Sequence, residues 1–518
     1  MVLASLLLVM SVSLWLGWMA HQALRRSAFM QGYFLGNRTL GSWAVALTAT
    51  VQSGGTFMGF PSFVYSYGWS VALWIASYMV VPITGFAVFG KRLAQMSRRL
   101  GAITVPDLLR ERFQSPLAGL TASLLILCFM TFMMVAQFKA GALIMREAWT
   151  GGGWQTAAEP DGMDRYYYVG LFLFTAIVVG YTLLGGFLAA VWTDLFQSVL
   201  MLVGILILLP LVLQQAGGLE EATRRAMARA GPGIAFLPGR DAEGRAFLPL
   251  GLAVSYFFLW VFAGLGQPAT LVRVMACKSA DTLRRSVYLL GLYNVFIYPP
   301  LIVICICGRA LIPDLPPGQS DAIVPRLAVH VGGTLPWGGL LAGLVLTAPF
   351  GAVMSTVSSY MVVIAAGVVR DVYQRFLRPH ASARELRRLS YLVMLLIGVV
   401  AVVANLQPVE YLQAIVVFSG ASGAATFFMP AFMAAFWRRA TAAGVVASMV
   451  AGAATVLGLY VAGWLGPDPL IGEKSRFSPY YLCQLHPVVW GLGVSVLAGL
   501  GVSMLTEPPR GRILDELF

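Results

Sequence analysis

Charged residues are scarce in this chain, and their scarcity excludes an ordinary soluble protein. Only 11% of the 518 residues are charged, whereas soluble domains average about 25%. Hydrophobic residues make up 58% of the chain, and its mean hydropathy is +0.78. Because a soluble fold cannot hide so much apolar surface, the sequence predicts an integral membrane protein.

Cysteine and histidine are also rare. The five cysteines lie in or beside apolar segments, and Cys305 and Cys307 have neither zinc-site nor redox-motif spacing. The four histidines are scattered, and no glycine-rich nucleotide loop precedes a helix. We therefore interpret the cysteines as packing residues, and we expect neither an enzyme nor a bound organic cofactor.

No polar block is large enough to form a second domain, so we expect one transmembrane domain over residues 1–518. A bilayer needs about 20 apolar residues per helix, and counting such runs gives about thirteen spans in an all-α polytopic protein. The run 2–20 lacks a cleavage site and predicts a retained extra N-terminal helix. A core at about 40–440 and C-terminal helices at about 441–505 complete the expected division.

The basic residues indicate which side of the membrane each loop faces. Net charge is +13, but the basic residues gather in short clusters between apolar runs, which argues against nucleic-acid binding. The main clusters fall at 25–38, 91–112, 273–285, 370–388, 438–439 and 510–512. By the positive-inside rule these clusters are cytoplasmic, the N-terminus is outside and the C-terminus is cytoplasmic. A longer outward loop also predicts a surface helix around 219–230.

Two spans contain residues that interrupt a continuous helix. They are the segments 48–55, rich in small and polar residues, and 264–268, which reads Gly-Leu-Gly-Gln-Pro. The second break comes five spans after the first, so an inverted repeat of five plus five helices would place both at one central site. The alternative is that these small residues only allow close helix packing.

Four hydroxyl residues fall within five positions of the ninth predicted span. Ser355, Ser358 and Ser359 follow helical i, i+3 and i+4 spacing and so share one face. Hydroxyls and the carbonyls of an unwound helix could form a sodium cage together with the break near Ala49 and Gln52. Alternatively, the hydroxyls bond back to their own helix carbonyls.

Two isolated charges lie within apolar spans. Asp194 predicts a cation ligand or an ion-pathway residue, with an interfacial anchor as the alternative. Lys139 could hold a substrate carboxylate, extend to the outer interface or pair with an acid.

With these breaks, hydroxyls and buried charges, the chain resembles the sodium:solute symporter family, which has the inverted-repeat fold of LeuT-type transporters. The likeness covers most of the chain, and it is greatest to sodium/pantothenate symporters. Its main segments are Gly32–Arg38, Gly185–Phe187, Trp192–Gln197, Ala352–Thr356, Arg370–Tyr373, Gly308–Leu315 and Leu346–Pro349. The pair Ser358 and Ser359 and the lysine at 139 depart from the pantothenate pattern.

The resemblance implies particular ligands for sodium. The main site would use backbone carbonyls of Ala49, Gln52 and Ala352 and the hydroxyls of Ser355 and Thr356. A likeness to sialic-acid transporters implies a possible second sodium, with the ligands Ser355, Ser358, Ser359 and Asp194. Sodium would be the coupling ion.

We therefore expect a sodium-coupled symporter that imports a small organic solute, with a carboxylate such as pantothenate as the favoured substrate. Expected substrate ligands are Ser53, Thr56, Phe57, Tyr78, Gln137, Lys139, Phe262 and Gln267. Alternatives are a proline-like amino acid, another monocarboxylate, sialic acid, a sugar, or a facilitative pore. The expected location is the plasma membrane, which is the inner membrane in a Gram-negative cell, with no obligatory protein partner.

Overall fold

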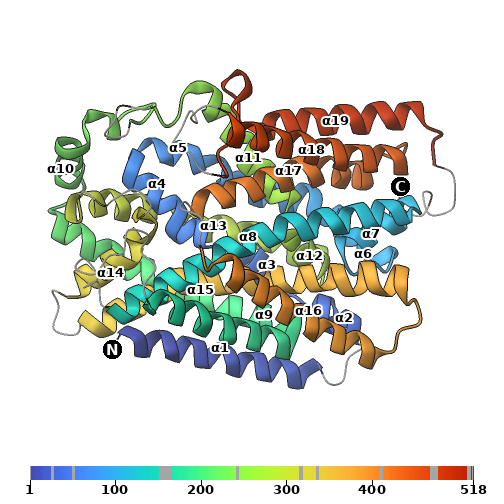
Figure 1. The fold of residues 1–518 in the computed structure, drawn as a ribbon, viewed down its shortest axis with the longest axis horizontal. Helices are drawn as coiled ribbons and strands as arrows, with labels where there is room; N and C mark the ends of the chain where they lie inside the picture. Colours follow the sequence, from blue (N-terminus) through green and yellow to red (C-terminus); the bar gives the residue numbers. More distant parts are fainter. Residues whose placement is uncertain are drawn as a thin grey trace.

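The structure is a computed structural model. It describes residues 2–24, 29–49, 53–150, 165–240, 244, 246–313, 315, 319–333, 338–407, 412–466, 476–509, 515 and 517. Within these ranges the ordered elements are helices and short helical turns, and no β-strand occurs. The predicted all-α class is confirmed, and Figure 1 shows the long helices lying side by side along the long axis of the molecule.

The elements follow one another with short connections. The α-helices are α1 (Val2–Leu24), α2 (Phe29–Leu35), α3 (Ser42–Ala49), α4 (Phe60–Tyr67), α5 (Ser70–Ala76), α6 (Lys91–Arg99), α7 (Val105–Phe113), α8 (Pro116–Thr150), α9 (Arg165–Ala216), α10 (Leu219–Ala230), α11 (Leu250–Gly266), α12 (Pro268–Met275), α13 (Ala280–Leu311), α14 (Ile323–Gly332), α15 (Gly338–Ala366), α16 (Ala383–Ala404), α17 (Leu412–Phe436), α18 (Ala442–Leu465) and α19 (Pro487–Leu505). Short 3-10 or π-helical segments occupy Gly36–Arg38, Gly55–Gly59, Ser77–Val80, Pro82–Gly90, Pro232–Ile234, Ser320–Ala322, Gly367–Leu377 and Leu482–Gln484. The surface helix expected around 219–230 is α10.

Eleven segments of the described chain are long and apolar enough to cross a membrane, against about thirteen expected. One difference lies in α9, whose 52 residues would extend about 78 Å as a straight helix, far beyond a bilayer core of about 30 Å. Its backbone leaves the helical region at Gly186, where φ is 53° and ψ is −137°. A single element therefore holds enough chain for two crossings.

Contacts with α15 show that α9 reverses direction at Gly186. Before the glycine, Phe174 packs on Phe350, and Tyr181 donates a hydrogen bond to the Met354 carbonyl. After the glycine, rising residue numbers in α9 meet falling residue numbers in α15, because Asp194 contacts Ser359 and Gly204 lies against Ala348. The first half of α9 thus runs parallel to α15 and the second half antiparallel to it.

The second difference concerns the segment from α3 to α4. Helix α3 ends at Ala49, residues 50–52 lie outside the described residues, and a π turn at Gly55–Gly59 leads into α4. Neither piece alone is long enough to be counted as a span. The first predicted interruption coincides with this division, while the count of thirteen stays a prediction.

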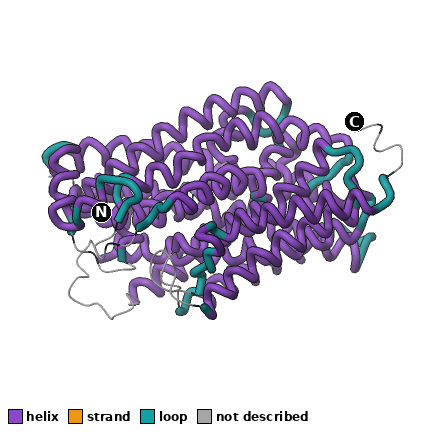
Figure 2. Tube along the Cα trace, turned by 90° about the horizontal axis from the view of Figure 1, so that it is seen from above, coloured by secondary structure: helices purple, strands orange, loops and turns teal. Residues whose placement is uncertain are grey.

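The two chain ends lie at opposite ends of the molecule (Figures 1 and 2). In Figure 1, α10 and α14 lie at the end that holds the N-terminus, and α6 and α7 lie toward the end that holds the C-terminus. An odd number of crossings requires this arrangement. The end with α6 and α7 is the one that the basic residues predict to be cytoplasmic.

The centre of the bundle is formed by α15 and α17. Nearly every residue of both helices is buried, whereas most residues of α1, α16, α18 and α19 are at least partly exposed. The exposed residues of these outer helices are largely leucine, valine and tryptophan, as expected for surfaces that face lipid. The hydroxyl-rich part of the chain therefore lies on the most deeply buried helix.

Candidate functional site

The two interrupted segments meet at one cavity of about 60 Å³. Ser53 and Thr56 line it from the first segment, and Gln267 lines it from the second. Gln267 is the break itself, because α11 ends at Gly266, Gln267 has extended dihedrals, and α12 begins at Pro268. The prediction that both breaks border a common site agrees with this arrangement.

The break after α11 is closely packed as well as unwound. A Cβ atom on Gly266 would lie 2.6 Å from the carbonyl oxygen of Gly423 in α17. Only glycine allows the two backbones to approach this closely. The side chain of Gln267 is held by Tyr360 of α15, whose hydroxyl donates to Oε1 at 2.7 Å.

Of the eight expected substrate ligands, four line the cavity: Ser53, Thr56, Tyr78 and Gln267. Phe57 and Phe262 do not. Phe57 is fully buried elsewhere, and Phe262 packs against Phe258 and Phe428. Nearness to a break along the sequence therefore does not place these two aromatic side chains in the cavity wall.

Most of the aromatic lining and one amide of the cavity were not predicted from the sequence. The cavity wall includes Trp74, Trp260, Tyr298, Tyr360 and Gln413, and no charged side chain lines it among the described residues. Oε1 of Gln413 is buried against Gly59, where a Cβ atom would lie 2.1 Å from it, and it accepts no hydrogen bond from the described protein atoms. To predict these residues from the sequence, one would need to know which face of each helix turns toward the two breaks.

Gln137 supports the site without lining it. Its Oε1 accepts a hydrogen bond from the backbone nitrogen of Gly54 at 2.7 Å. A Cβ on Gly54 would lie 2.9 Å from both Ala140 Cβ and Gln137 Oε1, so glycine is required for this contact. Gln137 of α8 thus positions the backbone that follows the first break.

Lys139 has a partner of its own within the protein. Its ammonium nitrogen lies 3.7 Å from Oδ2 of Asp321, and both side chains are almost fully buried. Lys139 does not line the cavity. Of the three possible roles of this lysine, pairing with an acid is the one that the structure shows.

The described residues among the expected main sodium ligands lie at the end of α3 and in the middle of α15. Ser355 and Thr356 donate to the carbonyl of Ala352 at 2.9 and 3.0 Å. Ala49 is the last residue of α3, and Gln52 lies outside the described residues. The alternative, in which the hydroxyls bond back to a carbonyl of their own helix, therefore occurs, and the role of these residues in binding sodium stays a prediction.

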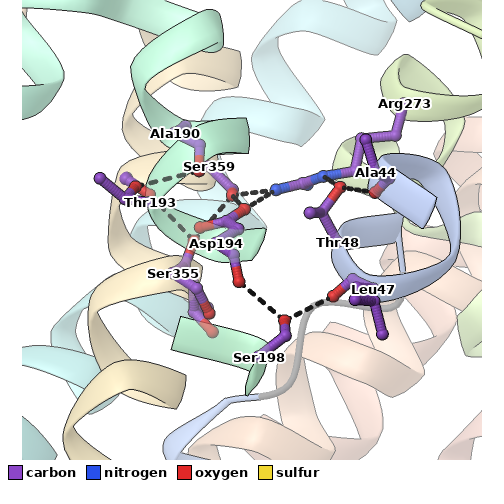
Figure 3. Close-up of polar contacts among 12 residues, drawn as sticks. Ala44, Leu47, Thr48, Ala190, Thr193, Asp194, Ser198, Arg273, Ser355 and Ser359 are labelled. Carbon is purple, nitrogen blue, oxygen red and sulfur yellow. Dashed lines mark hydrogen bonds and ion pairs between the residues drawn. The ribbon is translucent and has the colours of Figure 1, made fainter. Parts of the chain in front are cut away.

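The ligands expected for a second sodium form a hydrogen-bonded cluster around an arginine (Figure 3). Arg273 of α12 donates through Nη2 to Asp194 of α9 and to Ser359 of α15. Its Nε donates to Thr48 of α3 at 3.1 Å. Ser359 also lies 3.2 Å from Asp194 Oδ2, and Ser358 bonds back to Ser355 at 3.1 Å.

This cluster corrects the interpretation of Arg273. The basic cluster at 273–285 predicts a cytoplasmic loop position for Arg273, but the residue is only 1% exposed and pairs with Asp194. A buried carboxylate needs a positive partner, and a guanidinium already fills that role here. The second sodium stays a prediction, and any such ion would have to share Asp194 with Arg273.

A model of the sodium:solute symporter family matches residues 33–452, which include both breaks, the cavity and the hydroxyl face. The chain belongs to the sodium:solute symporter family. It is therefore a multi-pass membrane transporter that couples solute to sodium, and not an enzyme.

Characterised relatives span nearly the whole symporter. It is 29% identical over 491 residues to a sodium/pantothenate symporter of Escherichia coli (strain K12), covering 94% of this chain and 93% of that one. It is 27% identical over 500 residues to a high-affinity proline transporter of Bacillus subtilis (strain 168), covering 95% and 96%. The fold matches that of a solved Na⁺-coupled sialic acid symporter in a substrate-bound outward-open state, with a TM-score of 0.74, 20% identity and coverage of 98% and 99%. The expected fold class is thereby confirmed.

Proposed function

We propose that this symporter imports a small organic carboxylate, with pantothenate as the first candidate, together with sodium. The observation that carries the proposal is the position of two helix N-termini at the cavity. Ser53 and Thr56 lie in the first turn after the first break, and Gln267 and Thr270 lie at the start of α12. Helix N-termini carry partial positive charge and attract carboxylates, so the site needs no basic side chain.

Neutral donors complete the proposed carboxylate site. Thr56, Tyr78 and Thr270 bring hydroxyls to the cavity, and Gln413 brings an amide. Sodium bound between α3 and α15 would add positive charge nearby and stabilise the form that accepts the solute from outside. The membrane potential would contribute about 2.3 kcal/mol per charge per 100 mV to inward transport.

A zwitterion such as proline is the second candidate, and the aromatic lining supports it. Trp74, Trp260, Tyr298 and Tyr360 present aromatic rings to a cavity that has no acidic side chain among the described residues. Aromatic faces attract ammonium groups, with about 0.5–2 kcal/mol per contact. A relative that matches almost as well as the pantothenate symporter is named a proline transporter.

Uptake by sealed membrane vesicles tests the proposal. Labelled pantothenate, proline, sialic acid and a neutral sugar are supplied with an inward sodium gradient, with equal sodium on both sides, and with potassium in its place. We expect accumulation of pantothenate only with the gradient. Accumulation of proline alone would replace the first candidate by the second, and uptake of the sugar alone would contradict the carboxylate proposal.

Orientation and location belong to the same proposal. We place the N-terminus outside and the C-terminus in the cytoplasm, within the plasma membrane. The support is the concentration of basic residues at the end that holds α6 and α7.

A further inference from the structure

Residues 232–240 and 246–248, which we call the outer clamp, lie between α10 and α11 and pack against the turn from α4 to α5. The backbone nitrogen of Trp69 in this turn donates to the Ile234 carbonyl at 2.9 Å. A Cβ atom on Gly68 would lie 1.9 Å from the same carbonyl, so only glycine allows the contact. The clamp therefore docks directly on the turn, toward the expected outer end of the molecule (Figure 1).

The two parts of the clamp are joined to each other through their backbones. Phe247 donates its backbone nitrogen to the Gly239 carbonyl at 2.9 Å, and Leu248 donates to the Pro238 carbonyl at 2.8 Å. The side chain of Phe247 is 0% exposed, whereas that of Phe236 in the same clamp is 65% exposed. Phe247 is thus a side chain that anchors the clamp in the protein, and Phe236 is not.

Phe247 is anchored among aromatic rings of α4 and α5. Its ring stacks on Tyr67, with centroids 4.4 Å apart and an interplanar angle of 19°. It also meets Phe63 edge to face at 5.4 Å and lies 6.5 Å from Trp74. Aromatic pairs at these separations attract one another in addition to the burial of their surfaces. The clamp is therefore bound to both helices that follow the first break.

The same aromatic cluster forms part of the wall of the cavity between the breaks. Phe60 and Trp74 line the cavity, and their rings stack at 6.2 Å. Trp74 also packs edge to face on Trp260 of α11, another lining residue, at 4.8 Å. Phe60, Phe63 and Tyr67 follow i, i+3 and i+7 spacing, so they share one face of α4. This face connects the clamp at its outer end to the cavity at its inner end.

We propose that the outer clamp closes the solute cavity toward the outside, and that Phe247 is a positioning residue that holds α4 and Trp74 in the closed arrangement. Helix α4 follows a break, and residues at the ends of elements are where hinges absorb changes of direction. When Phe247 leaves its aromatic site, α4 and Trp74 can move away from α11 and open the cavity. The inference rests on the proposed function, in which this cavity holds the solute, and adds the residue that controls access to it.

The competing interpretation is that Phe247 only fills space in a buried cluster. In that case Phe247→Ala should lower the temperature of unfolding and leave access to the cavity unchanged. Phe247→Leu refills most of the volume and should return access most of the way to that of the wild type. Phe236→Ala is the matched control, because it removes an exposed ring from the same clamp.

The first test measures access to the cavity and needs no solute. A reporter cysteine replaces Ile75, which lines the cavity and is 5% exposed, in a protein whose exposed Cys128 and Cys483 are changed to serine. An impermeant thiol reagent is added outside right-side-out vesicles, with potassium in place of sodium. Phe247→Ala should raise the rate of reaction about five- to tenfold, since it removes at least one aromatic pair. Phe236→Ala should leave the rate unchanged.

The second test measures solute affinity with labelled pantothenate, or with proline if the wild type accumulates that instead. The apparent affinity of a solute falls with the fraction of protein in the form that holds it. The external concentration for half-maximal uptake should therefore rise about five- to tenfold in Phe247→Ala. The maximal rate per protein in the membrane should be retained, whereas a misfolded variant would lose it.

Two results would overturn the proposal. They are an unchanged reactivity of the Ile75→Cys reporter in Phe247→Ala, and an equal rise for a second reporter, Ala228→Cys, on the exposed surface of α10. If Phe247→Ala is absent from the membrane, Ile234→Ala must raise the reactivity of Ile75→Cys, because it shortens another fully buried side chain of the clamp. A wild type that accumulates none of the solutes would contradict the proposed function, and the reporter cysteine would still decide on the clamp.

Discussion

The ammonium nitrogen of Lys139 lies 3.7 Å from Oδ2 of Asp321, and the pair is buried between α8 and the turn that precedes α14. Asp321 also accepts the backbone nitrogen of Leu412 at 3.2 Å. The contact thus joins three parts of the chain next to Gln413, which lines the cavity. Lys139 serves to neutralise a buried acid, and a solute carboxylate is not needed to explain it.

Replacing Lys139 by glutamine should therefore destabilise the protein. Breaking a buried ion pair by removing one partner costs about 3–5 kcal/mol, because the remaining charge stays buried. Lys139→Gln should lower the temperature of unfolding of the purified protein, and the double variant Lys139→Gln/Asp321→Asn should recover most of the loss.

The double variant also distinguishes a structural lysine from a solute ligand. We expect its Michaelis constant for a carboxylate to equal that of the wild type. A raised Michaelis constant in a protein of normal stability would identify Lys139 as a ligand of the substrate.

The main sodium site predicts a selective effect of Thr356→Ala. Loss of one hydrogen-bonding group to a charged partner is worth about 1.5–3 kcal/mol, so half-maximal sodium should rise about tenfold or more. Thr182→Ala is the matched control, because Thr182 is equally buried and bonds back to Val178 at 2.7 Å. Equal sodium activation in both variants would contradict the predicted cage.

The pairing of Arg273 with Asp194 predicts one sodium per solute. The guanidinium already neutralises the carboxylate, which leaves a second ion little advantage at this position. The ratio of labelled sodium flux to solute flux should be near one, and Ser358→Ala should leave it unchanged. A ratio near two that falls in Ser358→Ala would establish the second sodium.

Membrane orientation can be tested with single cysteines. Cys128 and Cys483 are exposed and must first be replaced, while the other three native cysteines are buried. A cysteine at His380, between Arg370 and Arg388, should react with an impermeant reagent only after the inner side is opened. One at Gly152, in the segment 151–165, should react from outside, and the reverse pattern would invert the topology.

Much of the fold follows from the sequence because apolar length and the placement of glycine and proline are local properties. The break at Gln267 was visible as Gly-Leu-Gly-Gln-Pro, and the hydroxyl face of α15 as a helical repeat. The division of α9 was also expected, since apolar residues are too numerous there for one crossing. Composition alone does not show that Gly186 reverses the chain without an intervening loop.

The partners of buried charges could not be predicted in the same way. Arg273 and Asp194 lie 79 positions apart, and Lys139 and Asp321 are even farther apart in the chain. In the sequence, Arg273 lies close to basic residues that are typical of a cytoplasmic loop. Nothing in this local pattern predicts that the residue belongs to α12 and is buried inside the bundle. The aromatic lining depends likewise on helical rotation, which periodicity defines poorly in helices that are apolar on every face.

The reversal at Gly186 has a consequence for how the protein is made. A Cβ on this glycine would lie 2.5 Å from the Tyr33 carbonyl, and its φ of 53° disfavours other residues. With no loop between the halves of α9, the ribosome delivers two crossings to the insertion machinery as one continuous hairpin. Any substitution of Gly186 should therefore appear first as poor assembly and rapid degradation in the cell, before a transport assay has protein to measure.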